Sequence, residues 1–149
     1  MRVMNSLKTL AASLGACLLS ASLLLALPAQ AQEKLPPIKV GTTQSLSGRF
    51  QQEGALQMQG LLMWAEDINS RGALLGRTVE LVHYDDHSDE DRVEELYEKL
   101  ITEHRVDLLI GPYSSELTLR ATDVAERHNM PIVTAAASAD RIWERGYKN

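Results

Sequence analysis

The sequence predicts an α/β fold, a parallel, doubly wound (Rossmann-like) sheet with helices on both faces. Two observations lead to this prediction. Short apolar runs that are typical of buried strands alternate with stretches whose apolar residues recur at helical spacing. These helical stretches are long enough to cross back over a sheet, as a connection between parallel strands requires.

The N-terminal residues 1–31 have the layout of a cleavable secretory signal. A basic end precedes an apolar stretch at residues 10–27, and Ala29 and Ala31 offer the small side chains that a signal peptidase accepts. We therefore expect cleavage after Ala31. The product is expected to be periplasmic and not inserted in the membrane.

Two other interpretations of the apolar stretch stay open. Its length is close to the roughly 20 residues that span a bilayer, which would suit an uncleaved anchor. Residues 14–17, which end in Cys17, resemble a lipoprotein box. Against the anchor, no basic cluster follows the stretch. Against the lipoprotein, cleavage before Cys17 would leave residues 18–27 as an apolar new terminus.

Charge and cysteine content limit which partners the remaining chain can bind and what can stabilise its fold. The sequence has 15 Lys and Arg against 20 Asp and Glu, and removal of the signal takes Arg2 and Lys8 but no acidic residue. Nucleic acid is excluded as a partner, because phosphate neutralisation needs clustered basic residues. Cys17 is the only cysteine and leaves with the signal, so stability must come from buried apolar surface rather than disulfides.

The first predicted elements are a strand, a loop and a helix. After a proline-containing leader, residues 38–42 form the strand, and residues 45–54 are expected to be loop. From Ala55 the apolar side chains recur at helical spacing, and the pattern stops at residues 70–72. The buried stripe expected on this helix consists of Met58, Leu61, Leu62, Ala65 and Ile68.

A second strand and helix follow a glycine-flanked turn. The strand covers residues 79–84 and ends in Asp85 and Asp86. Ser88 and Asp89 are expected at the start of the helix, because negative charge is favourable at the positive end of the helix dipole. The buried stripe expected on this helix consists of Val93, Leu96, Tyr97, Leu100 and Ile101.

Two more strands and one helix complete the pattern. Residues 106–110 are a short, nearly uninterrupted apolar run, as expected for a central strand covered on both faces. A third helix is predicted from about Ser115, then a fourth strand at residues 130–134. Residues 135–149 are expected to be loop with one short helical turn. The buried stripe expected on the third helix consists of Leu117, Ala121, Val124 and Ala125.

The predicted sheet places a ligand site at one edge. In an open parallel sheet, ligands bind beyond the carboxyl ends of the strands, beside helix N-termini. That rule selects four loops, residues 44–54, 85–89, 111–116 and 135–140. In the third loop, the Ser115 hydroxyl and unpartnered helix amides suit a carboxylate. In the fourth, small side chains expose main-chain carbonyls that accept from an ammonium group, so together the two loops suit a zwitterion.

Residues 38–149 resemble the Leu/Ile/Val-binding, or type I periplasmic-binding-protein, family. The resemblance rests on the order and spacing of short segments, each of them weak alone. These segments are Ile38-Lys39-Val40-Gly41, Ser45-Leu46-Ser47-Gly48, Ala65-Glu66-Asp67-Ile68-Asn69, Tyr84-Asp85-Asp86, Ile110-Gly111-Pro112-Tyr113-Ser114-Ser115, Pro131-Ile132-Val133 and Arg145-Gly146-Tyr147. The resemblance implies a two-lobed clamp that captures a small amino acid or related amide and delivers it to the membrane permease of an ABC importer.

The resemblance also implies ligand-binding roles. Ser115 matches the serine that binds the ligand α-carboxylate through its hydroxyl and amide, with Ser114 beside it in the same motif. Ala136 matches the residue whose carbonyl meets the ammonium group. Ser138 stands where the family usually has threonine, and so keeps the hydroxyl but loses a methyl contact.

Three further residues are expected to shape the pocket, and the domain is expected to be partial. Tyr113 matches a pocket-wall residue, while Phe50 and Glu53 fall in the loop that often flanks the ligand side chain. An acidic Glu53 departs from the aromatic residue that can occupy this position. Because family members continue into a second lobe, we expect residues 32–149 to be a truncated N-terminal lobe. Most of the surface of a bound ligand would then remain exposed to solvent.

Other functions compete for the same residues. The same fold also serves as the sensory domain of receptors. A membrane helix after a second lobe would favour this receptor interpretation. An α/β enzyme is a further alternative, but no Gly-x-Ser-x-Gly turn surrounds Ser114 and Ser115, and no histidine is placed as their base. We therefore expect neither an enzyme nor a cofactor.

Several remaining polar and aromatic residues are expected to be structural. A metal site would draw on His83, Asp85, Asp86, His87 and Glu90, but adjacent strand residues point to opposite faces, so we expect none. A partly charged imidazole is favourable near a helix C-terminus, where both other histidines fall. The two tryptophans are expected to pack. These four residues are His104, His128, Trp64 and Trp143.

Overall fold

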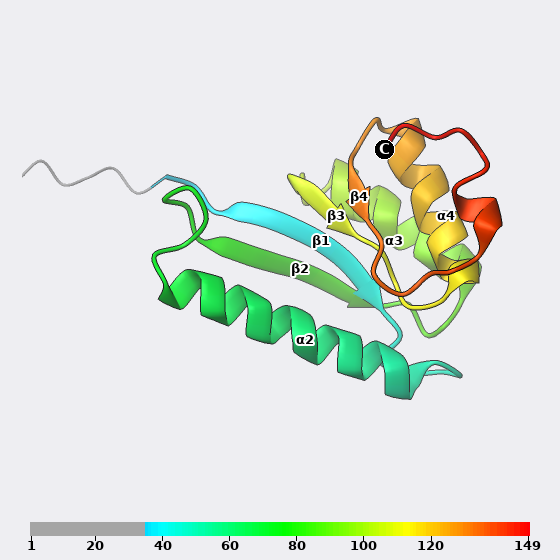
Figure 1. Ribbon diagram of the computed structural model, residues 1–149, viewed down its shortest axis with the longest axis horizontal. Coiled ribbons are helices and arrows are strands. Elements are labelled where there is room, and N and C mark those ends of the chain that lie inside the picture. Colours follow the sequence, from blue (N-terminus) through cyan, green and yellow to red (C-terminus); the bar gives the residue numbers. More distant parts are fainter. Residues whose placement is uncertain (1–34) are drawn as a thin grey trace, which may run out of the picture. The chain divides into compact units, whose positions relative to one another are not determined.

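The computed structural model describes residues 35–149, so the expected signal peptide and the cleavage position after Ala31 lie outside the described residues. Strands and helices alternate along the described chain (Figure 1), which confirms the α/β prediction. The elements are β1 (Ile38–Gln44), α2 (Gln51–Ser70), β2 (Val79–Asp85), α3 (Glu90–Thr102), β3 (Leu108–Ile110), α4 (Ser115–Arg127), β4 (Ile132–Val133) and the 3₁₀ turn η1 (Asp140–Ile142).

The strands form one parallel sheet in the order β2-β1-β3-β4. In the register, Ile38 pairs with Val79 of β2 and Val40 pairs with Leu108 of β3. Because each parallel connection must return over a face of the sheet, α2 covers one face while α3 and α4 cover the other (Figure 1). None of the helices in residues 35–149 is both long and apolar enough to cross a membrane.

The larger part of the core lies between the sheet and the pair α3 and α4. It consists of Val93, Tyr97, Leu100, Val106, Leu109, Leu117, Ala121, Val124 and Ala125. All four positions predicted for α4 are buried, and so are the α3 positions except Ile101, which is half-buried. The Tyr97 hydroxyl donates to the Ile110 carbonyl at 2.5 Å, so the one polar atom of this ring has a partner inside the core.

The smaller part of the core lies under α2. It consists of Ile38, Val40, Ala65 and Val79, with Ile68, Leu81 and Ile110 packed against it. Met58 and Ala65 of the predicted α2 stripe are buried, but Leu62 is 50% exposed, so the prediction was wrong there. The reason is that α2 packs mainly over β1 and β2, which leaves one flank of the helix in solvent.

Helix α2 begins at Gln51, four residues before the predicted start, so the loop prediction was wrong for residues 51–54. Phe50 occupies the N-cap position without a side-chain cap. Gly54 is buried in the first turn, and a Cβ there would meet the Ser45 carbonyl oxygen at 2.3 Å. The helix therefore packs directly onto the loop that precedes it, which only glycine permits.

The β3–β4 side of the sheet is less covered than predicted. Leu109 is buried, but Leu108 is 42% exposed, so the prediction of a strand covered on both faces was wrong at that position. Val133 of β4 is 68% exposed. Among residues 35–149, β4 pairs with β3 and with no other strand, so it forms an edge of the sheet.

Candidate functional site

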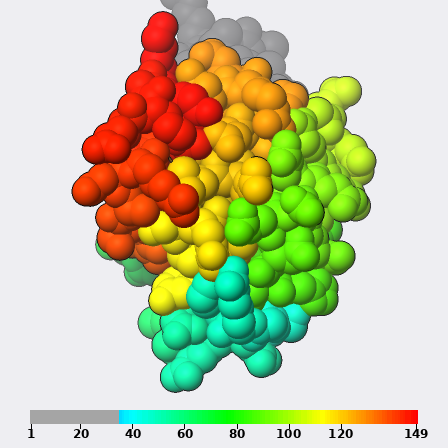
Figure 2. Space-filling model, turned by 90° about the vertical axis from the view of Figure 1, so that its right-hand side faces the viewer, coloured from blue at the N-terminus to red at the C-terminus, as the bar shows by residue number. Residues whose placement is uncertain are grey.

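The carboxyl ends of all four strands meet at one edge, because the sheet is parallel. Figure 2 views this end of the molecule, where the cyan, green, yellow and red segments come together. The loops there form two pairs. We call residues 45–48 and 85–88 the aspartate loop pair, and residues 111–115 and 135–139 the serine loop pair.

Asp86 is the centre of the aspartate loop pair and is fully buried. One carboxylate oxygen accepts from the Thr43 hydroxyl at 2.8 Å. The other accepts from the Ser45 hydroxyl at 2.6 Å and from the Ser88 amide at 2.9 Å. The carboxylate therefore ties the end of β1 to the turn before α3.

Asp85 adds a second set of hydrogen bonds between the same loops. Its Oδ1 accepts from the amides of Leu46 and His87, both at 2.9 Å, and its Oδ2 accepts from the Ser47 hydroxyl at 2.8 Å. Burial acts to raise the pKa of Asp85, but hydrogen bonds from His87, Ser47 and Leu46 outweigh it and hold the pKa below 3.8. The two loops also approach so closely at Gly48, which has φ 81°, that a Cβ would lie 2.3 Å from the His87 carbonyl oxygen.

The residues considered for a metal site mostly make hydrogen bonds or ion pairs with other protein groups. All four carboxylate oxygens of Asp85 and Asp86 accept hydrogen bonds from the end of β1 or from the two loops. Glu90 pairs with Arg120 at 3.0 Å, and His83 is exposed on β2. Within residues 35–149, no three His, Cys, Asp or Glu residues group in a way that could hold a metal ion.

The serine loop pair is joined by hydrogen bonds around the N-terminus of α4. Ser114 caps the helix by accepting from the Leu117 amide, and its own amide donates to the Ala136 carbonyl at 3.2 Å. The Ser115 hydroxyl oxygen accepts from the amides of Ser138 and Ala139, each at 3.1 Å. The loop after β4 is thereby held against the first turn of α4.

This arrangement leaves a group of donors at the start of α4. A hydroxyl oxygen accepts two hydrogen bonds and donates one, so the two amides that bond to Ser115 leave its O–H as a donor. The first amides of a helix have no intrahelical acceptor, and none contacts those of Ser115 or Glu116 among the described residues. One hydroxyl and two amides can therefore bind one carboxylate, with the helix dipole in their favour.

The remaining predicted residues occupy different places. Tyr113 is half-buried and packs edge-on against Phe50, with ring centroids 5.5 Å apart, so these two form an aromatic wall between the loops. Glu53 is exposed on the first turn of α2 rather than in the predicted loop. Ser138 contacts Ser115 through its main-chain amide, and the residue itself is exposed.

Two glutamines that the sequence analysis did not single out hold the base of the serine loop pair in place. Gln44 is fully buried, and its Nε2 donates to the Thr42 hydroxyl at 3.0 Å and to the Gly111 carbonyl at 3.4 Å. Gln57 of α2 donates to the same carbonyl at 3.2 Å. The carbonyl at the base of the loop is thus fixed by β1 and α2 together. The only signal in the sequence was the position of Gln57 four residues before Leu61, on the flank of the apolar stripe.

Comparison with known proteins finds relatives that are all described as binding proteins. A family model described as "Periplasmic binding protein" matches residues 37–149. The leucine-, isoleucine-, valine-, threonine-, and alanine-binding protein of Pseudomonas aeruginosa is 33% identical over 111 residues, and the Leu/Ile/Val-binding protein of Escherichia coli is 30% identical over 111 residues. Each alignment covers 74% of this chain but 30% of the relative, so the chain spans less than a third of the relatives' length.

Solved structures show the same architecture. The branched-chain amino acid transporter substrate binding protein of Streptococcus pneumoniae, in complex with isoleucine, is 25% identical with a TM-score of 0.70, over 72% of this chain and 31% of that one. A leucine binding protein from Thermotoga maritima is 24% identical with a TM-score of 0.67, over 74% and 30%. The second likeness concerns the fold alone, and both agree with the predicted parallel α/β sheet.

Proposed function

This chain belongs to the periplasmic binding protein family, and we propose that its serine loop pair forms one wall of a site that captures a small amino acid for an ABC importer. The observation that carries the proposal is the set of free donors at the N-terminus of α4, formed by the Ser115 hydroxyl and the amides of Ser115 and Glu116. The relatives named for amino-acid ligands support the choice of ligand class.

In this proposal the ligand carboxylate binds at the start of α4. The amides of Ser138 and Ala139 occupy both lone pairs of the Ser115 oxygen. The O–H is therefore free to donate to a ligand carboxylate, and the hydroxyl needs little reorganisation when ligand binds. Hydrogen bonds to a charged group are stronger than neutral ones. The same donors select against ligands that lack the carboxylate.

The ligand ammonium group is assigned to the loop after β4. The Ala136 carbonyl accepts one hydrogen bond, from the Ser114 amide, and a carbonyl oxygen has a second lone pair to offer. Ser138 adds a hydroxyl beside it. The two ends of a zwitterion would then bind to two loops that a single serine already holds together.

The ligand side chain is assigned to the aromatic wall of Phe50 and Tyr113. Arg49 covers the outer face of Phe50, with its guanidinium carbon 4.6 Å from the ring centroid, which keeps that face out of contact with ligand. The exposed edge of the wall suits an apolar side chain such as leucine or valine, which gains by leaving water. Glu53 stands one helical turn away and is assigned no direct contact.

The proposal extends to the setting of the protein. Residues 1–31 act as a signal that is removed after Ala31, residues 32–149 belong to an N-terminal lobe, and the partner is the membrane permease of an importer in the cell envelope. The chain has no catalytic role in this scheme. The intact mass of the protein from its host's exported fraction tests the first point, since a retained signal would contradict it.

Nuclear magnetic resonance titration tests the ligand assignment. Addition of L-leucine, L-valine or L-threonine is expected to shift the amide signals of Ser115, Glu116, Ser138 and Ala139. The affinity is expected to be weak, because a pocket that binds tightly encloses about 70–90% of its ligand and this wall supplies only part of that.

Substitutions make the test specific. Ser115→Ala should weaken binding at least about tenfold, the effect of losing one hydrogen bond to a charged group. Ser70→Ala, at the exposed C-terminal end of α2, removes the same hydroxyl elsewhere and should change nothing. Equal binding of leucine and isopentylamine, which lacks the carboxylate, would contradict the assignment.

A further inference from the structure

The outer side of helix α2 is apolar. Leu56 is 62% exposed and Met63 is 63% exposed, and a spacing of about two turns places both on one face of the helix. Met58 and Ala65 lie on the opposite face and are buried. Residues 54–65 contain no charged side chain. A helix that is apolar on both sides is typical of one that is buried on both sides.

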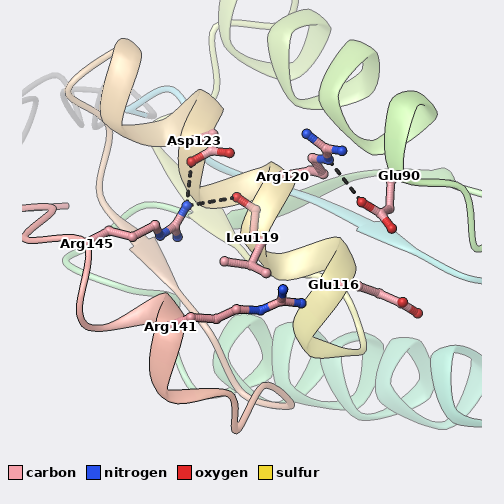
Figure 3. Close-up of a pocket in the computed structure, with 7 residues that line it drawn as sticks. All are labelled: Glu90, Glu116, Leu119, Arg120, Asp123, Arg141 and Arg145. Atoms are coloured by element: carbon pink, nitrogen blue, oxygen red, sulfur yellow. Dashed lines mark hydrogen bonds and ion pairs between the residues drawn. The ribbon is translucent and has the colours of Figure 1, made fainter.

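The outer sides of α3 and α4 are polar by comparison. Arg120 of α4 pairs with Glu90 of α3, and Arg145 of the tail pairs with Asp123 of α4, as Figure 3 shows. These residues line a hollow of about 440 Å³ that has as many acidic as basic side chains. Paired charges therefore suit this side of the molecule to water, whereas the middle of α2 has none.

The sheet face on the α2 side is covered over one half. Helix α2 packs mainly over β1 and β2, and it is the one helix on that face among residues 35–149 (Figure 1). Ile110 packs against the core under α2, and Val133 is its partner in β4, so both side chains point to the α2 side. Leu108, two residues before Ile110, points the same way.

We call Leu108, Ile110 and Val133 the uncovered half-face. Leu108 and Val133 are exposed, and Ile110 is half-buried. Parallel sheets occur almost exclusively with both faces covered, because their strands are apolar on both sides. The half-face therefore lacks a helix at the place where a parallel sheet needs one.

The outer side of α2 and the uncovered half-face fit each other in a pair of copies. Both belong to the same side of the sheet, with α2 over one half and the half-face beside it. A two-fold axis along the strands, midway between two facing sheets, places α2 of each copy on the half-face of the other. Each α2 is then enclosed by two sheets, and each half-face receives the helix that it lacks. Such an interface is isologous, because the same two surfaces meet twice.

The flank of α2 beside the half-face adds an aromatic side chain to this fit. Gln57 reaches the Gly111 carbonyl beyond the end of β3, so its flank of the helix faces that strand. Trp64 lies about two turns further along the same flank and is 37% exposed. In the paired arrangement the two α2 helices lie side by side along this flank. Trp64 is then covered by the partner helix, as large aromatic residues at interfaces are.

We propose that the outer side of α2 and the uncovered half-face form a homodimer interface, with a second copy of this chain as the partner. Helix α2 has 20 residues and is about 30 Å long. Its contacts with the partner helix and with the two half-faces bury roughly 1,200 Å² in total, the lower end of the range for stable interfaces. The dimer should therefore form at micromolar concentration. The interface lies on the sheet faces, so the serine loop pairs at the carboxyl edge stay outside it.

Sedimentation equilibrium of the exported protein tests the proposal. We expect the mass of two copies at high micromolar concentration and a decline toward one copy on dilution. Met63→Lys and Val133→Glu should each raise the dissociation constant at least about a hundredfold, because a two-fold interface buries the introduced charge twice. Both positions are exposed in the single copy, so circular dichroism should show an unchanged fold. A mixture of the two variants should dimerise more tightly than either alone, because one contact is then unaltered and the other pairs opposite charges.

Trp143→Lys is the matched control. Trp143, which the sequence predicted to pack, is 64% exposed in the tail directly after η1, so that prediction was wrong. It is as exposed as Met63, but η1 packs on α4, away from the proposed interface, so this variant should leave dimerisation unchanged. A single copy at every concentration, or unchanged dimerisation in Met63→Lys or Val133→Glu, would overturn the proposal. Neither result would touch the proposed amino-acid site, because its ligand titration needs one copy.

Discussion

The two loop pairs at the carboxyl edge of the sheet are held together by different polar groups. In the aspartate loop pair, two carboxylates accept hydrogen bonds from β1 and both loops, and Asp89 caps α3 by accepting from the Arg92 amide. In the serine loop pair, one neutral hydroxyl oxygen holds the loops together, and Ser114 caps α4 by accepting from the Leu117 amide. The two helix N-termini are therefore capped alike, and they differ in the charge that surrounds them.

This difference shows how a parallel sheet can reserve only part of its edge for ligand. A helix N-terminus attracts anions, but the start of α3 carries Asp89, Glu90 and Asp91, which repel a ligand carboxylate. The start of α4 has Glu116 as its acidic residue, and Arg49 neutralises it. The charges, rather than the fold, decide which loop pair is available.

The largest expected loss of stability comes from breaking the hydrogen bonds of the aspartate loop pair. Asp86→Ala should lower the free energy of unfolding by about 3 kcal/mol, because the Thr43 and Ser45 hydroxyls and the Ser88 amide lose a buried acceptor. Urea denaturation followed by circular dichroism measures it. Asp91→Ala, on the exposed side of α3, should change stability by less than about 0.5 kcal/mol. A loss below about 1 kcal/mol for Asp86→Ala would show that the two pairs differ less than we state.

The next effect depends on pH. The pKa of Asp85 is lowered in the folded protein, so protons bind the unfolded chain first as the pH falls. Its contribution to stability is therefore present above the ordinary pKa near 3.8 and is lost as the pH drops through the lower, folded value. Asp85→Asn should destabilise the protein at pH 7 by about 1 to 2 kcal/mol and should flatten the decline below pH 4. Parallel acid-unfolding curves for the two proteins would exclude this role.

A smaller effect of opposite sign is expected in the serine loop pair. Ser114 has φ 80° and ψ 151°, a region that costs other residues than glycine about 1–3 kcal/mol. Ser114→Gly removes this strain and forfeits a helix cap worth a few tenths of a kcal/mol. The melting temperature should therefore rise. A fall in melting temperature would mean that the cap matters more than the backbone conformation.

The smallest expected change in stability comes from Ser115→Ala. Its hydroxyl accepts from two amides at the surface, where water can replace it, so we expect a loss of about 0.5 kcal/mol. Amide hydrogen exchange should accelerate at Ser138 and Ala139 and stay unchanged at Leu109 in the core. Uniform acceleration would instead show that Ser115 supports the whole fold and not only the loop.

The sequence predicted elements best where an amphipathic helix buries its whole apolar stripe in the core. The stripe of α4 was correct at every position because Leu117, Ala121, Val124 and Ala125 all face the core. The start of α2 was missed because Gln51 and Gln52 carry no apolar periodicity and Phe50 provides no side-chain cap. Leu62 was assigned to the core because periodicity cannot show how much of a sheet a helix covers.

The candidate site was predictable in position and less so in detail. The rule for parallel sheets brought the loops of Ser115 and Ser138 together from sequence alone, and the structure places them in contact. It could not show that the main chain of residue 138 makes the contact. The roles of Gln44 and Gln57 depend on where the Gly111 carbonyl lies in three dimensions, which no local pattern contains.

The short strand β4 has a consequence for how the protein behaves in solution. Its outer main-chain groups form no ladder with another strand in residues 35–149, and Val133 presents an apolar side chain beside them. An unpaired edge can act as a template for a strand from another chain, but β4 has only two residues, and a short edge strand limits such pairing. The brevity of β4 therefore protects the sheet where the side chains alone would favour association.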